Sequence, residues 1–204
     1  PAPRAIPLGC MTAVARPIDA PNAPEVEAAF RAVPEEQVAE ILDGELHTQP
    51  RPAPAHANAA SVLSGELHGP FRRGRGGPGG WVFLVEPELH LGPRPDKLVP
   101  DLAGYRRERL PELPAEAYFS LAPDWLCEVI SPRTEATDRG KKLRIYRREG
   151  VPHVWLVNPI SRTLEVYRLE GGHYALLDTY EDEETVRAEP FEAIELELAL
   201  LWTP

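Results

Sequence analysis

The chain has 204 residues, with 22 basic and 32 acidic side chains and a formal net charge of −10. Its apolar fraction of 43% is enough to build a core, which excludes wholesale disorder, and its length favours one globular domain. No uncharged apolar run reaches the roughly 18 residues of a membrane helix, and the negative charge argues against coating nucleic acid by bulk electrostatics. We therefore expect a cytoplasmic protein without a membrane partner.

The N-terminal third of the sequence predicts a leader and two helices. Residues 1–24 are rich in Pro and Ala and are predicted to be disordered or loosely attached, so the domain is expected at 25–204. After Pro34, the spacing of Val38, Ile41 and Leu42 predicts a short helix that ends at Gly44. A strand is expected at 45–48, a second helix at 55–67, and a flexible basic, glycine-rich loop at 71–80.

The remaining sequence is dominated by strand patterns around one helix. Strands are predicted at 81–91, 98–105, 124–131, 151–158, 163–169 and 173–180. A helix is predicted at about 136–149, closing at Gly150, whereas 191–202 fits either a strand or a short helix. This order of elements predicts one α/β or α+β domain.

One acidic residue interrupts a strand whose two faces are otherwise apolar. Trp125, Cys127 and Val129 alternate with Leu126 and Ile130, the pattern of a central strand covered on both sides. Glu128 shares the second face, where burying an ionised carboxylate costs several kcal/mol unless it is compensated. A buried ion pair would compensate it, and so would a bound metal ion.

Further carboxylates make the metal interpretation the sharper one. Asp101 follows a proline in another apolar strand, Glu86 and Glu88 share a third segment, and Glu45 follows the first predicted helix. Carboxylates from neighbouring strands suit the hard cations Mg²⁺ and Mn²⁺. We predict Asp101 and Glu128 as ligands, with Glu88 and Glu45 as less certain ones; a solvated strand edge would explain Glu86 and Glu88 equally well.

The helix at 136–149 adds a lysine to this acidic set. Asp138, Lys142 and Tyr146 recur at intervals of four, which places Lys142 at the edge of the buried stripe. A lysine beside metal-binding carboxylates can orient an attacking water or stabilise charge on phosphate, although a solvated cationic helix is the simpler alternative.

Basic residues are clustered along the sequence, although the net charge is negative. Thirteen of the 22 lie in three short segments, 72–75, 106–109 and 133–148, whereas 181–197 is strongly acidic. Such polarised charge is compatible with a local phosphate-binding groove. The candidate DNA-contacting residues are Arg72, Arg73, Arg75, Arg139 and Lys141.

Several motifs together resemble the Uma family of restriction-endonuclease-like proteins, over most of the chain from about Pro34 to Leu169. They are Pro100-Asp101, Cys127-Glu128-Val129-Ile130-Ser131-Pro132, Asp138-Arg139-Gly140-Lys141-Lys142-Leu143 with Tyr146, and Gly150-Val151-Pro152-His153-Val154-Trp155. The family is similar to the PD-(D/E)XK nuclease superfamily. This resemblance implies a central mixed sheet flanked by helices, here with an added C-terminal β-hairpin, and a metal-dependent endonuclease acting on DNA.

The resemblance also implies roles for individual residues. Asp101 and Glu128 match the metal-binding acids, while Glu45 and Glu88 match acidic positions that can complete the metal shell. The motif's lysine position is occupied by Ile130, and the resemblance suggests that Lys142 on the following helix replaces it. Without that replacement the chain would be an inactive nucleic-acid- or protein-binding module. Metal-assisted hydrolysis of a small phosphorylated substrate is a second alternative, and a homodimer is compatible with double-strand cutting.

Overall fold

The N-terminal hairpin corrects the first predicted helix. The computed structural model describes residues 21–203, so most of the predicted leader lies outside the described residues, and helix α1 (Pro24–Arg31) comes first. The segment predicted as a helix after Pro34 forms strand β1 (Gln37–Leu42) instead, paired antiparallel with β2 (Glu45–Pro50). Asp43 and Gly44 link them with φ of +52° and +82°. An Asp-Gly pair with two positive φ angles is the preferred two-residue hairpin turn, so Gly44 closes a strand pair and not a helix.

The larger sheet is mixed. It contains, in spatial order, β10 (His173–Glu181), β9 (Thr163–Glu170), β8 (His153–Asn158), β7 (Trp125–Val129), β6 (Leu102–Arg106) and β3 (Trp81–Val85). Only β7 and β8 pair in parallel among its strands, and the helical segment between them makes the crossover that a parallel pair requires. The predictions of strands at 124–131, 151–158, 163–169 and 173–180 are confirmed.

The smaller sheet has the order β2-β1-β5-β4, with β4 at Leu89–Leu91 and β5 at Asp96–Leu98. Two predicted strands are therefore each divided between the sheets: 81–91 forms β3 and β4, and 98–105 falls across β5 and β6. Pro87 and Pro100 stand at the two breaks. A proline has no N–H for a sheet ladder, which explains why pairing stops there and the chain passes from one sheet to the other.

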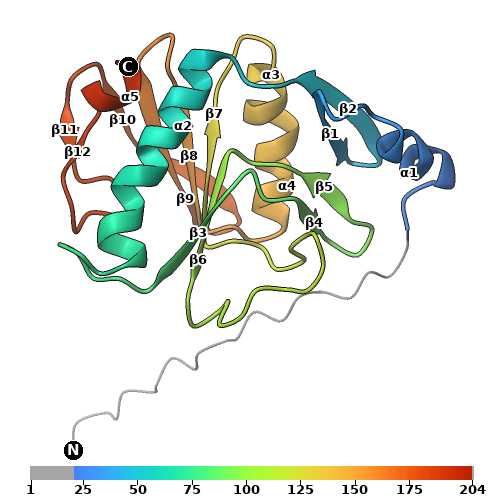
Figure 1. Ribbon diagram of the computed structural model, residues 1–204, viewed down its shortest axis with the longest axis horizontal. Helices are drawn as coiled ribbons and strands as arrows, with labels where there is room; N and C mark the ends of the chain where they lie inside the picture. Colours follow the sequence, from blue (N-terminus) through green and yellow to red (C-terminus); the bar gives the residue numbers. More distant parts are fainter. Residues whose placement is uncertain (1–20, 204) are drawn as a thin grey trace, which may run out of the picture.

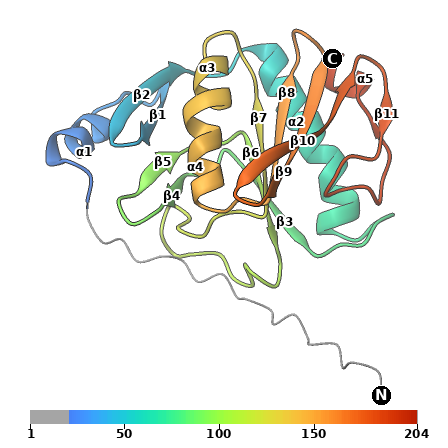
Figure 2. The ribbon, with the colours of Figure 1, turned by 180° about the vertical axis from the view of Figure 1, so that it is seen from behind.

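Helices cover both faces of the larger sheet. Helix α2 (Pro54–Leu67) lies in front of it in Figure 1, and the segment made of α3 (Glu135–Thr137), a π-helical turn (Asp138–Lys142) and α4 (Leu143–Arg148) lies in front of it in Figure 2. The predictions of helices at 55–67 and 136–149 are confirmed. Alternate residues of β7 serve the two cores, as the doubly apolar pattern predicted: Trp125 packs on the α2 side and Leu126 on the α4 side.

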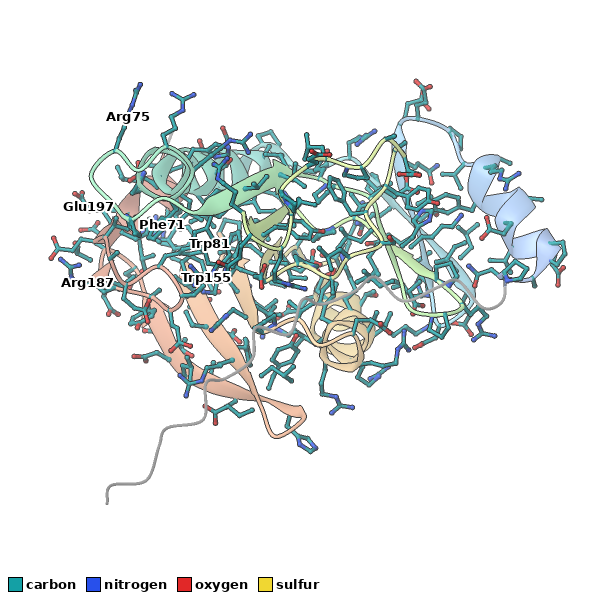
Figure 3. All side chains as sticks on the ribbon, turned by 90° about the horizontal axis from the view of Figure 1, so that it is seen from below. Phe71, Arg75, Trp81, Trp155, Arg187 and Glu197 are labelled. Atoms are coloured by element: carbon teal, nitrogen blue, oxygen red, sulfur yellow. The ribbon has the colours of Figure 1, made fainter. Side chains whose placement is uncertain are left out.

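The C-terminal segment completes the core on the α2 side. It forms a short pair, β11 (Thr185–Val186) with β12 (Leu196–Glu197), and then helix α5 (Ala199–Trp202). Figure 3 shows Phe71, Trp81 and Trp155 gathered at this end of the molecule, and Phe71 and Trp81 lie against Phe191, with ring centroids 4.8 and 4.9 Å away. Within residues 21–203, no helix combines the length and apolar character that crossing a membrane requires.

Candidate active site

The two chain crossings between the sheets place two carboxylates side by side. Glu86 precedes Pro87 and adopts a φ of +46°, while Asp101 follows Pro100. The backbone N–H of Glu86 donates to the carbonyl oxygen of Asp101 at 3.0 Å, which ties the crossings together. A positive φ is uncommon for a residue with a side chain and is often found at functional sites. Glu86 and Asp101 both line one cavity, so this turn lies at the cavity wall.

Lys142 lies almost completely buried among three carboxylates. Its ammonium group is 2.9 Å from Glu128 Oε1, 3.1 Å from Glu40 Oε1 and 3.6 Å from Asp138 Oδ1, and only 1% of the side chain is exposed. The three acids come from β7, β1 and the π-helical turn, so both sheets and the helix converge on one lysine. Sequence analysis placed Lys142 beside Glu128, and the structure brings the two together.

The carboxylate of Glu128 is held from one side only. The Tyr146 hydroxyl donates to Oε1 at 2.5 Å, and the Lys142 ammonium approaches the same oxygen. Among the described residues, no hydrogen bond reaches the other oxygen, Oε2. Glu128 also lines the cavity, so an oxygen that the protein leaves without a partner belongs to a cavity-lining carboxylate.

Both carboxylate oxygens of Asp101 have a partner, one a backbone N–H and the other a histidine ring. Its Oδ2 accepts a hydrogen bond from the backbone N–H of Val129 at 2.6 Å, and its Oδ1 lies 3.3 Å from His56 Nε2. The other ring nitrogen of His56, Nδ1, is buried without a hydrogen-bond partner. Burial alone would lower the pKa of His56, but the hydrogen bond and negative charge of Asp101 outweigh it and raise that pKa.

A cavity of about 500 Å³ connects these groups. Its lining includes the acids Glu86, Asp101, Glu128 and Asp138, together with His56. The walls come from the β2–α2 linker, the two crossings and the loop that leads from β7 into α3. In Figure 1 that linker passes over the top of the molecule beside the start of α3, which places the cavity at one end of the larger sheet.

The electrostatics of this cluster are unbalanced towards negative charge. Burial raises the pKa of Glu128 well above its usual value, against the opposing charge of Lys142, and it raises the pKa of Asp138 as well. Burial would lower the pKa of Lys142, but Glu128 and Glu40 more than reverse this, so the lysine stays charged. One ammonium group cannot neutralise Glu40, Asp101, Glu128 and Asp138 together, so the cluster favours binding protons or a cation.

The donor set fits a hard divalent cation. Asp101 and Glu128 offer carboxylate oxygens to one cavity, and the free Oε2 of Glu128 is the chemical type that Mg²⁺ and Mn²⁺ prefer. Within residues 21–203, no three side chains of the usual ligand types are already gathered closely enough to enclose an ion. That is compatible with Mg²⁺, which often uses one or two carboxylates and completes its shell with water and substrate phosphate.

The structure separates the two other predicted metal ligands from the cavity. Glu88 contacts His90 Nε2 at 2.6 Å on the smaller sheet, because the turn at Glu86 and Pro87 breaks the strand alternation that linked Glu86 to Glu88. Glu45 pairs with Lys141 at 2.6 Å on the surface. Neither lines the cavity, whereas Glu86 does.

The predicted DNA-contacting cations also lie away from the cavity. The guanidinium of Arg139 is held by Glu165 and Glu135 at 2.6 and 2.9 Å, and Lys141 is held by Glu45. Arg72, Arg73 and Arg75 are exposed, and Figure 3 shows Arg75 pointing away from the body of the molecule. None of the five lines the cavity.

Sequence analysis missed two groups that the fold brings into the site. Glu40 lies in the segment predicted as a helix, and only the pairing of β1 in the smaller sheet places it against Lys142 and the Val99 N–H. His56 was one polar residue in an otherwise ordinary helix pattern. The Asp43-Gly44 turn predicts that the segment before it is a strand. Glu40 is then a carboxylate within an apolar strand, which is the signal that could have identified it.

The fold is an α+β domain with helices on both faces of a mixed sheet and an acid-lined cavity. The crystal structure titled "putative nuclease belonging to DUF820", from Anabaena variabilis ATCC 29413, matches with a TM-score of 0.69. The two chains are 20% identical, and the match covers 87% of this chain and 96% of that one.

The family follows from the sequence itself. The model of the Uma2 family, described as "Putative restriction endonuclease", matches residues 26–200, and the chain therefore belongs to that family. The resemblance found in the sequence motifs is thereby confirmed. No match was found among curated proteins.

Proposed function

We propose that the chain is a metal-dependent nuclease that hydrolyses DNA phosphodiester bonds. One observation carries the proposal: the carboxylate of Glu128 is anchored through Oε1 by buried Lys142 and Tyr146, and Glu128 lines a cavity that Asp101 also lines. The descriptions of the family and of the structural neighbour, both of which name nucleases, support the same reaction class.

Each side chain has a role that follows from its contacts. Asp101 and Glu128 would hold Mg²⁺ or Mn²⁺, which when bound lowers the pKa of water and offsets charge on phosphate. The Val129 N–H and Tyr146 fix the two carboxylates in place. Because Lys142 is buried and does not line the cavity, it acts by orienting Glu128 and balancing its charge, not by touching the attacking water.

Plasmid nicking with Mg²⁺ or Mn²⁺ tests the reaction, and calorimetry with Mn²⁺ tests the site. Asp101→Asn and Glu128→Gln should abolish nicking and weaken Mn²⁺ binding, because each removes a charged oxygen ligand. Glu108→Gln, at an exposed acid away from the cavity, is the matched control. Glu88→Gln tests whether Glu88 is a metal ligand. Nicking and Mn²⁺ binding should equal those of wild type if Glu88 contacts His90 instead of the metal.

Two results would refute the proposal. Nicking that survives both Asp101→Asn and chelation would exclude the site. Wild-type protein that binds DNA but cleaves nothing with either metal would favour the inactive binding module, and cleavage confined to small phosphate esters would favour the small-substrate hydrolase.

A further inference from the structure

Two smaller cavities adjoin the central one. It shares Pro52, His56, Glu86 and Asp101 with a neighbouring cavity of about 300 Å³ beside α2. On its other side it shares Gln49, Pro50, Arg133 and Thr134 with a cavity of about 210 Å³ beside β2. Because they share lining residues, the three cavities lie next to one another in a row, which we refer to as the groove.

Two arginines line this groove, and their charges are engaged differently. Arg51 donates to the Glu35 carbonyl oxygen at 3.1 and 3.3 Å and lies 3.6 Å from Glu86. Arg133 is exposed, and within residues 21–203 its side chain forms no ion pair or hydrogen bond. It lines both the central cavity and the one beside β2. The positive charge of Arg133 is therefore available to a ligand.

Arg133 also differs from the other residues of the basic segments. Of the 13 cations in those segments, it alone lines any of the three cavities described. It follows Glu128 by five residues, on the loop that leads from β7 into α3, where Ser131 Oγ and Thr134 Oγ1 lie 3.0 Å apart. Ser131 and Thr134 line the central cavity together with Arg133, and an unpaired guanidinium can bind a phosphate through two parallel N–H donors.

We infer that Arg133 binds a backbone phosphate of the nucleic-acid strand, next to the phosphate that reaches Asp101 and Glu128. This inference rests on the proposed function and assigns strand binding to the groove instead of to the glycine-rich loop. Arg133 offsets the repulsion between the strand and the acids of the cavity, and the strand runs along the groove past the His56–Asp101 pair. The bound ligand class is a phosphodiester chain.

Fluorescence anisotropy with a labelled oligonucleotide in EDTA measures this contact without turnover. Arg133→Ala should weaken binding about three- to tenfold and reduce the slope of log K against log salt by about 0.7 to 0.9, the value for one lost phosphate contact. Arg133→Lys should keep the slope. Arg94→Ala is the matched control, because Arg94 is also exposed and lines none of the three cavities.

The outcomes separate this inference from the proposed function. An unchanged salt slope in Arg133→Ala overturns the inference even if the protein cleaves DNA, and so does a larger slope change in Arg73→Ala. A wild type that does not bind the oligonucleotide at low salt overturns it too. If Arg133→Ala lowers the slope while wild type cleaves nothing, the inference stands and the proposed function fails.

Discussion

Replacing Lys142 with Met should destabilise the protein strongly and in a pH-dependent way. The substitution keeps most of the side-chain volume but removes the ammonium group that lies 2.9 to 3.6 Å from Glu128, Glu40 and Asp138. Removing one partner of a buried ion pair costs about 3 to 5 kcal/mol of unfolding free energy. For a chain of this length that corresponds to a fall in Tm of about 6 to 20 °C.

The pH dependence follows from the carboxylates left behind. Burial already raises the pKa of Glu128, and losing Lys142 removes the charge that opposes this rise. Between the unfolded and the raised folded pKa, the folded state binds more protons than the unfolded state, so stability falls as pH increases through that window. The loss in Lys142→Met should therefore be smaller at pH 5 than at pH 8, because a protonated Glu128 carries no charge for Lys142 to balance.

Urea unfolding of wild type and variant at pH 5 and pH 8 measures both effects. Lys141→Met is the matched control, because its partner Glu45 is 69% exposed and such surface pairs contribute at most about 1 kcal/mol. Adding Glu128→Gln to Lys142→Met should recover part of the loss at pH 8. Equal urea midpoints for wild type and Lys142→Met at pH 8, or the same loss at both pH values, would refute the reasoning.

Three further substitutions test other parts of the fold by thermal or urea unfolding. Gly104→Ala should cost about 1 to 3 kcal/mol, because the new Cβ would lie 3.1 Å from a ring carbon of Phe83; a stability equal to wild type would show that the ring moves freely. Arg139→Ala should lower the free energy of unfolding by about 1 to 3 kcal/mol, because it breaks the paired hydrogen bonds to Glu165. Its DNA affinity should match that of wild type, and a loss of affinity without destabilisation would show that Arg139 contacts DNA. Gly44→Val should cost at least about 1 kcal/mol, since its φ of +82° disfavours a β-branched side chain, and an unchanged midpoint would contradict the hairpin turn.

Local patterns predicted the central strand and the buried stripe of the helical segment that follows it. The alternation around Glu128 identified a strand covered on both faces, and the four-residue spacing of Asp138, Lys142 and Tyr146 identified a buried helix stripe; all are buried in the structure. By contrast, three apolar residues after Pro34 suit either a helix or a strand. The Asp43-Gly44 turn decides for the strand, and reading Gly44 only as a helix stop produced the error.

The parts of the site that escaped prediction depend on distant partners. Glu40 meets Lys142 only because β1 pairs with β5 in the smaller sheet, and Glu86 replaces Glu88 at the cavity because a backbone turn breaks the strand alternation. Charge counts located the basic segments, but they do not reveal that Arg139 and Lys141 are already paired within the protein. Periodicity in the sequence predicts on which face of a helix or strand a side chain lies. It does not predict which residue from another element the side chain contacts.

The contacts of buried Lys142 form fully only when both sheets and the helical segment are folded. Its counter-charges come from the smaller sheet, the larger sheet and the connecting helix, so an intermediate with only one sheet formed leaves the ammonium group without a full set of partners. If only the larger sheet has formed, Lys142 still meets Glu128 and Asp138 but lacks Glu40, so its charge is incompletely balanced. The complete arrangement around Lys142 therefore exists only once the two sheets have joined.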